Sequence, residues 1–168
     1  MRLLQAVVLG LVCSIVGWVG AVSAEEALPR VTDHAVCAPE GVAVGGYDVV
    51  SYHSASAPIP GSVAHAQEFE GLTYLFASGE NLAQFAADPN RYVPKYRGWC
   101  SATLSMGNLA CPDFTNFKIE HGQLLLFERI GFSNGLDVWN LDPEGSSERA
   151  DGHYTRLLRE AASSQDAP

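Results

Sequence analysis

The stretch from Phe69 to Cys100 constrains the fold of this chain more than any other part of the sequence. Gly71 lies between two runs of strand-forming residues, where a short hairpin has to turn. In residues 72–76, Leu72, Tyr74 and Phe76 alternate with the residues at 73 and 75, which is typical of a strand with larger side chains on one face. We therefore expect an antiparallel hairpin whose first strand spans residues 63–70.

A helix should follow this hairpin. Ser78 can cap it by accepting a backbone N–H. Leu82, Phe85 and Ala86 share one face of such a helix and can close on the strands. Pro89 ends it, because proline disfavours helical geometry in the preceding residue.

The second half of the chain has the same order of elements. Residues 117–127 predict a hairpin that turns at His121-Gly122, and its apolar run 124–127 indicates a strand covered on both faces. Asn134 can cap a helix that ends at Asp142-Pro143, and a last helix follows. Residues 101–106 fit a helix or a strand equally well. The similarity of the halves is faint and extends only to the order of their elements.

These patterns predict a single α+β domain of small antiparallel hairpins with helices packed on them. An opening extended segment after Gly45-Gly46 would precede the first hairpin, and residues 108–116 would form a loop. The chain divides into a signal peptide at 1–24, a lead-in at 25–43, the domain at 44–162 and a disordered tail at 163–168.

The amino terminus resembles a secretory signal peptide. Arg2 precedes an apolar run at 3–21, and Val22-Ser23-Ala24 is a small-residue cleavage site. We expect a periplasmic or secreted protein; an uncleaved membrane anchor is the alternative. Cleavage near Ala24 removes one base and no acid, so the net charge changes from −9 to −10. Such acidity disfavours nucleic acid and anionic lipid as partners.

Several ordered motifs together resemble the YHS domain family, and most closely its longer, exported members. They cover about residues 44–143. The motifs are Gly46-Tyr47-Asp48-Val49-Val50-Ser51-Tyr52, Tyr74-Leu75-Phe76-Ala77-Ser78, Phe85-Ala86-Ala87-Asp88-Pro89, Arg91-Tyr92 and Gly98-Trp99-Cys100.

The shorter family members are metal-binding modules with three cysteines. Their cysteine positions correspond here to Ser51, Ala77 and Asn81, which cannot replace thiolate ligands of copper(I) or zinc. Longer members keep a cysteine after a Gly-aromatic pair, and Cys100 matches it. The resemblance therefore supports the scaffold more than a metal cage.

Cys100 is nevertheless the best candidate for a soft ligand of copper or zinc. We expect His53 and Asp48 as companion ligands, with Tyr47 and Trp99 lining a small pocket. Each residue also has a plainer interpretation. Buried cysteines are common, an Asp after a Gly-Gly-Tyr turn often caps backbone N–H groups, and His53 could lie in a surface loop.

Three cysteines remain after cleavage, which in an oxidising compartment suggests one disulfide and one free thiol. Cys37 and Cys111 lie outside the family pattern, in loop-like sequence, and we expect them to pair. A Cys100–Cys111 bridge is the rival arrangement.

No catalytic motif stands out, so we do not expect an enzyme. The leading hypothesis is an exported binding domain for a metal ion or small ligand. Two alternatives remain open. One is an envelope protein-interaction module that has lost its metal site, and the other is a thiol redox protein using Cys100, with Lys95 and Arg97 close to it in sequence.

Overall fold

The computed structural model describes residues 36–165 of the chain. The predicted signal peptide at 1–24, residues 25–35 of the lead-in and residues 166–168 lie outside this part. Within residues 36–165, no helix combines the length and apolar character that crossing a membrane requires.

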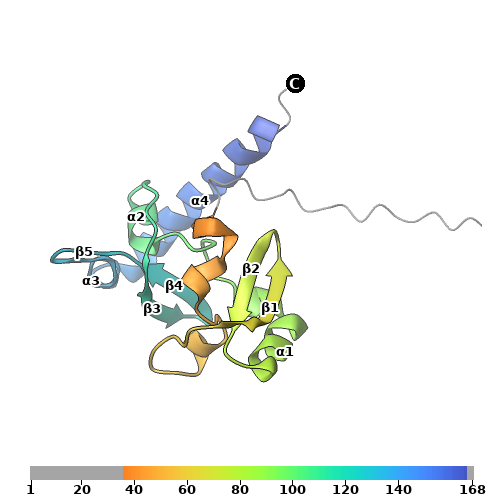
Figure 1. The fold of residues 1–168 in the computed structure, drawn as a ribbon. Coiled ribbons are helices and arrows are strands. Elements are labelled where there is room, and N and C mark those ends of the chain that lie inside the picture. Colours follow the sequence, from red (N-terminus) through yellow and green to blue (C-terminus); the bar gives the residue numbers. More distant parts are fainter. Residues whose placement is uncertain (1–35, 166–168) are drawn as a thin grey trace, which may run out of the picture.

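The described chain is a small α+β domain, as the sequence predicts (Figure 1). Its strands form three two-stranded antiparallel sheets, β1–β2, β3–β4 and β5–β6. The elements are β1 (Ser62–Phe69), β2 (Leu72–Phe76), α1 (Gly79–Ala87), α2 (Ser101–Ser105), β3 (Asp113–Glu120), β4 (Gln123–Phe127), β5 (Arg129–Ile130), β6 (Ser133–Asn134), α3 (Gly135–Asn140) and α4 (Pro143–Gln165). Short 3-10 turns are η1 (Pro39–Gly41), η2 (Ala43–Gly46), η3 (Ser51–His53) and η4 (Pro89–Arg91).

The first hairpin and its helix form where the sequence places them. Glu70 and Gly71 make the turn with φ of 48° and 78°, a left-handed conformation that glycine adopts at little cost. The Ser78 hydroxyl accepts the Asn81 N–H at 3.2 Å and caps α1. Phe85 of α1 is fully buried beneath the hairpin, which anchors the helix to it.

Strand β4 lies between two hydrophobic cores, and residues 124–127 are buried on both faces, as predicted. Leu124 and Leu126 belong to the first core, whereas Leu125 and Phe127 belong to the second. The first core also contains Ala43, Val44, Val49, Val50, Tyr52, Leu72, Tyr74, Phe76, Phe85 and Tyr92. The second also contains Tyr96, Cys100, Ala102, Leu104, Trp139 and Ala150. One strand thus joins both halves of the domain.

Two predicted segments that precede the hairpins have a different structure from the one expected. The segment after Gly45-Gly46 is not extended but coils into η3, because the Ser51 hydroxyl donates to the Asp48 carbonyl at 2.6 Å. Part of the loop predicted at 108–116 is strand, since β3 begins at Asp113 and pairs with Phe127.

Pro143 has a different role from the predicted one. It is the first residue of α4 rather than only the end of the preceding helix, and proline suits that position because its missing N–H would be unpaired there. Helix α4 continues to Gln165, so the disordered tail predicted from Ser163 does not begin there. Residues 101–105, left open by the sequence, are helical.

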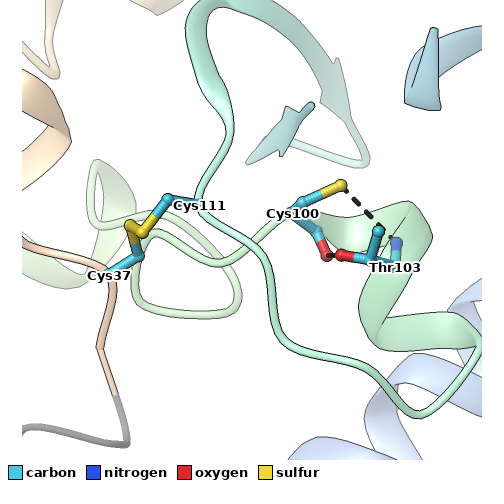
Figure 2. Close-up of a disulfide and its surroundings, with 4 residues drawn as sticks. All are labelled: Cys37, Cys100, Thr103 and Cys111. Carbon is cyan, nitrogen blue, oxygen red and sulfur yellow. Dashed lines mark hydrogen bonds between the residues drawn. A yellow bond between two sulfur atoms is a disulfide. The ribbon is translucent and has the colours of Figure 1, made fainter. Parts of the chain in front are cut away.

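The predicted disulfide between Cys37 and Cys111 is present, with Cα atoms 5.6 Å apart (Figure 2). It joins the start of the described chain to the segment that leads into β3. The Cys37 N–H also donates to the Arg97 carbonyl at 3.2 Å. The rival Cys100–Cys111 pairing is therefore wrong, and Cys100 is the free cysteine of residues 36–165.

Removing this disulfide should destabilise the protein strongly. The bridge spans 74 positions, and closing a loop of that size lowers the entropy of the unfolded chain by an amount equivalent to about 4 kcal/mol. We expect the Cys37→Ser, Cys111→Ser variant to lose about that much free energy of unfolding in urea titrations. Adding reductant should destabilise the native protein and leave this variant unchanged. If the two proteins were equally stable without reductant, the expectation would be contradicted.

Candidate functional site

Asp48 is fully buried beside the first core, and both oxygens of its carboxylate are occupied. Oδ1 accepts the Val50 N–H at 2.9 Å. Oδ2 accepts the Ala77 N–H at 2.9 Å and the side-chain amide of Asn81 at 2.6 Å. The carboxylate thus ties the opening segment to the end of β2 and the first turn of α1.

Ser51, Ala77 and Asn81 all form hydrogen bonds with Asp48. Ala77 and Asn81 donate to it directly. The Ser51 hydroxyl donates to the Asp48 carbonyl at 2.6 Å and accepts the Ile59 N–H at 2.9 Å. These bonds form a closed network in which the backbone carbonyl and both carboxylate oxygens of Asp48 have hydrogen-bond partners.

Cys100 is fully buried in the second core. Its sulfur accepts the Glu128 N–H at 3.2 Å and the Thr103 N–H at 3.5 Å, the latter in the first turn of α2. Figure 2 shows the sulfur pointing toward Thr103 and away from the disulfide. The cations close to it in sequence are engaged elsewhere: Lys95 pairs with Asp151 at 2.9 Å and Arg97 with Glu70.

His53, the last residue of η3, is half-buried. Its ring meets the Tyr92 ring edge to face, with centroids 5.3 Å apart. Its Nε2 is buried without a hydrogen-bond partner. Burial lowers the pKa of His53 below its ordinary value, and the nearby Arg91 lowers it further.

The structure does not bring the three predicted ligands together. Asp48 lies beside the first core, Cys100 within the second, and His53 against Tyr92. Among residues 36–165, no three His, Cys, Asp or Glu side chains lie close enough to hold a metal ion.

The two predicted pocket residues also lie apart. Tyr47 packs against the first core and Trp99 against the second. A shallow surface depression lies beside Cys37, Val44 and Arg97, and neither Tyr47 nor Trp99 lines it.

Asp48 and Cys100 nevertheless occupy equivalent places in two structural repeats. Each ends a Gly-aromatic-X motif, Gly46-Tyr47-Asp48 or Gly98-Trp99-Cys100, and both glycines have positive φ. The Asp48 N–H donates to Ile59 and the Cys100 N–H to Ala110, at 2.8 and 2.9 Å. Their carbonyls accept the hydroxyls of Ser51 and Thr103, respectively. The two motifs therefore have the same local hydrogen bonds.

The hairpins that follow the motifs repeat residue for residue. Ser62 pairs with Phe76 in the first, and Asp113 pairs with Phe127 in the second, with an irregular register after each pair. Both residues of the second pair lie 51 positions after their counterparts. Ala77 and Glu128 follow these hairpins, and their N–H groups bind Asp48 and Cys100.

The arrangement gives both side chains one structural task, which is to accept the N–H that follows each hairpin. This explains why an acid and a thiol are buried at these places. The predicted likeness of the two halves rested on the order of their elements alone. A further signal in the sequence is the pair of Gly-aromatic-X motifs, whose separation nearly equals that of the two hairpin turns.

The chain matches no model of a known protein family, no curated protein and no solved structure with which it was compared.

Replacing Asp48 should be costly because it leaves three donors unpaired. We expect Asp48→Ala to lower the free energy of unfolding by about 3 kcal/mol, and Asp48→Asn, which keeps one acceptor oxygen, by less. The exposed Glu148 offers a control, since Glu148→Ala should change stability by about 0.5 kcal/mol or less. Urea titration measures all three; an Asp48→Ala protein as stable as the control would contradict the network's role.

His53 should make stability depend on pH. Its pKa is lower in the folded protein than the value of about 6.5 expected in the unfolded chain. The unfolded chain therefore binds a proton more readily, and stability should fall as pH drops through about 6.5 toward the folded pKa, then level off for this group.

The measurement is the melting temperature between pH 8 and pH 5, a window set by the unfolded pKa of about 6.5. His53→Gln should weaken the decline, whereas His121→Gln, at an exposed turn, should leave it unchanged. Parallel curves for the native protein and His53→Gln would show that His53 does not titrate as expected.

Proposed function

We propose that this protein is an exported, non-catalytic binding domain with a YHS-like scaffold, and that it acts by contacting another protein of the envelope or the extracellular space. The observation that carries this proposal is the hydrogen-bonded carboxylate of Asp48 among Ser51, Ala77 and Asn81. These are the positions at which the shorter family members hold a metal with thiolates.

The chemistry of this network favours a structural role over metal binding. Two backbone N–H groups and one amide take up the carboxylate oxygens. A metal ion at Asp48 would displace these donors, and each buried donor left unpaired costs about 1–3 kcal/mol. Copper(I) also prefers soft sulfur ligands, which this network does not offer.

Export is supported by the cysteines and by the amino terminus. The Cys37–Cys111 disulfide is of a kind that persists in oxidising compartments such as the periplasm or the extracellular space. The predicted signal peptide supports the same location.

A second candidate function uses Cys100, because this cysteine lies outside the disulfide. It could serve as one soft ligand for copper or zinc, or as a redox thiol. Its sulfur is fully buried and accepts two backbone N–H groups, so either activity would require the Glu128 and Thr103 contacts to open.

Metal titration separates the two candidates. For an interaction module we expect zinc or copper(I) to leave the melting temperature of the disulfide-bonded protein unchanged. We also expect chemical cross-linking in the cells that export the protein to give a defined adduct with another envelope or secreted protein. Cys100→Ser should preserve that adduct.

Two results would overturn the proposal. One is a stoichiometric, stabilising metal effect that is lost in Cys100→Ser, which would favour the second candidate. The other is the absence of any protein adduct from cross-linkers that reach the whole exposed surface.

A further inference from the structure

The β5–β6 ribbon is an insertion relative to the first repeat. In the first half the chain passes from the hairpin to its helix directly, through Phe76-Ala77-Ser78-Gly79, with Ser78 as the cap. In the second half Phe127-Glu128 and Asn134-Gly135 correspond to these residues, and Asn134 caps α3. Residues 129–133 lie between them. The first repeat makes the same connection without such a segment, so the fold does not require the ribbon.

The insertion exposes large apolar side chains instead of burying them. Phe132, in the turn of the ribbon, has a relative exposure of 111 %, and Ile130 beside it has 66 %. Figure 1 shows the ribbon reaching away from the body of the domain beside α3. The next exposed apolar residues, Val138 and Leu141, follow in and just after that helix.

The ribbon adds no side chain to either hydrophobic core. The pairing of its two strands is limited to Arg129 with Asn134 and Ile130 with Ser133. Its base is tied to β3 by the Arg129–Asp113 ion pair and by the Asn116 side chain, which donates to Asn134. An apolar tip that is neither needed for the fold nor packed on it marks a contact surface, since exposing such side chains to water is unfavourable.

The charges around the ribbon indicate what it can contact. Asp137 and Glu144 are exposed in the chain that follows it, whereas the charge of the exposed Asp142 is balanced by Arg149. The two arginines nearby are already paired with acids, Arg129 with Asp113 at 3.5 Å and Arg149 with Asp142 at 3.2 Å. The surface is therefore apolar with an acidic rim.

A second copy of this chain or an anionic membrane would bring like charge to this rim, because the whole chain carries a net charge of −9. A basic protein surface complements it. We propose that the β5–β6 ribbon is the docking element of the domain, and that Phe132 and Ile130 pack against apolar side chains flanked by Lys and Arg on a partner protein. This assignment rests on the proposed function and names the surface that carries it out.

The test uses a randomised peptide library displayed on phage, selected against the disulfide-bonded protein. Selected peptides should combine Lys or Arg with aromatic or aliphatic residues. Their affinity should fall about tenfold or more in Phe132→Ser, as expected for an aromatic anchor. It should also fall when NaCl is raised from about 0.05 to about 0.5 M, because salt screens the charges.

Two further variants make the test specific. Deleting residues 129–133 joins Glu128 directly to Asn134, just as Ala77 precedes Ser78 in the first repeat. The deletion removes the Arg129–Asp113 ion pair and the hydrogen bond from Gly135 to the Glu128 carbonyl. The variant should therefore melt cooperatively at a lower temperature and lose peptide binding. The matched control is His121→Ser, at the exposed tip of the other hairpin, which should bind as the native protein does.

Peptides that bind the deletion variant and Phe132→Ser as tightly as the native protein would overturn the ribbon assignment and leave the proposed function standing. A library that yields no basic-apolar binder would also overturn it, while the proposed function would still be decided by cross-linking. Dimerisation or vesicle binding that Phe132→Ser abolishes would show that the occupant is a second copy or lipid, and the proposal would be wrong.

Discussion

The domain depends on a side-chain acceptor buried at the end of each hairpin. Asp48 accepts the N–H of Ala77, and Cys100 accepts the N–H of Glu128. Each N–H belongs to the residue that directly follows a hairpin, where the chain leaves its antiparallel partner and would otherwise bury an unpaired donor. One solution therefore appears twice, with a carboxylate in one repeat and a thiol in the other. This shared task explains why Asp48 and Cys100, two of the predicted metal ligands, have their acceptor atoms occupied by backbone N–H groups.

Strand β4 couples the two repeats. Its alternating side chains enter both cores, so neither half can complete its packing without it. The disulfide adds a second link, from the start of the first repeat to the approach to β3. The free energy of folding is thus shared between the halves, although each has its own hairpin, cap and helix.

Local patterns predicted much of this fold because local physics decides it. The turns at Gly71 and Gly122, the caps at Ser78 and Asn134 and the doubly buried β4 all follow from short-range signals. The coiled opening segment follows from a local hydrogen bond between Ser51 and Asp48 that competes with extended structure. The places of Asp48, His53 and Cys100 depend on contacts between distant residues, such as the one between Asp48 and Asn81. The spacing of the Gly-aromatic-X motifs could place Asp48 and Cys100 in separate repeats, but it could not show which groups each side chain contacts.

The two tryptophans of the described chain give the repeats different optical properties. Trp99 packs against the second core, and Trp139 is buried within it and donates its indole N–H to Glu120 at 3.1 Å. The aromatic side chains of the first core are tyrosines and phenylalanines only. Indole emission from this part of the molecule therefore reports on one half, whereas circular dichroism of the backbone reports on both. Whether the halves melt as a single cooperative unit can be judged by whether the two signals change at the same temperature.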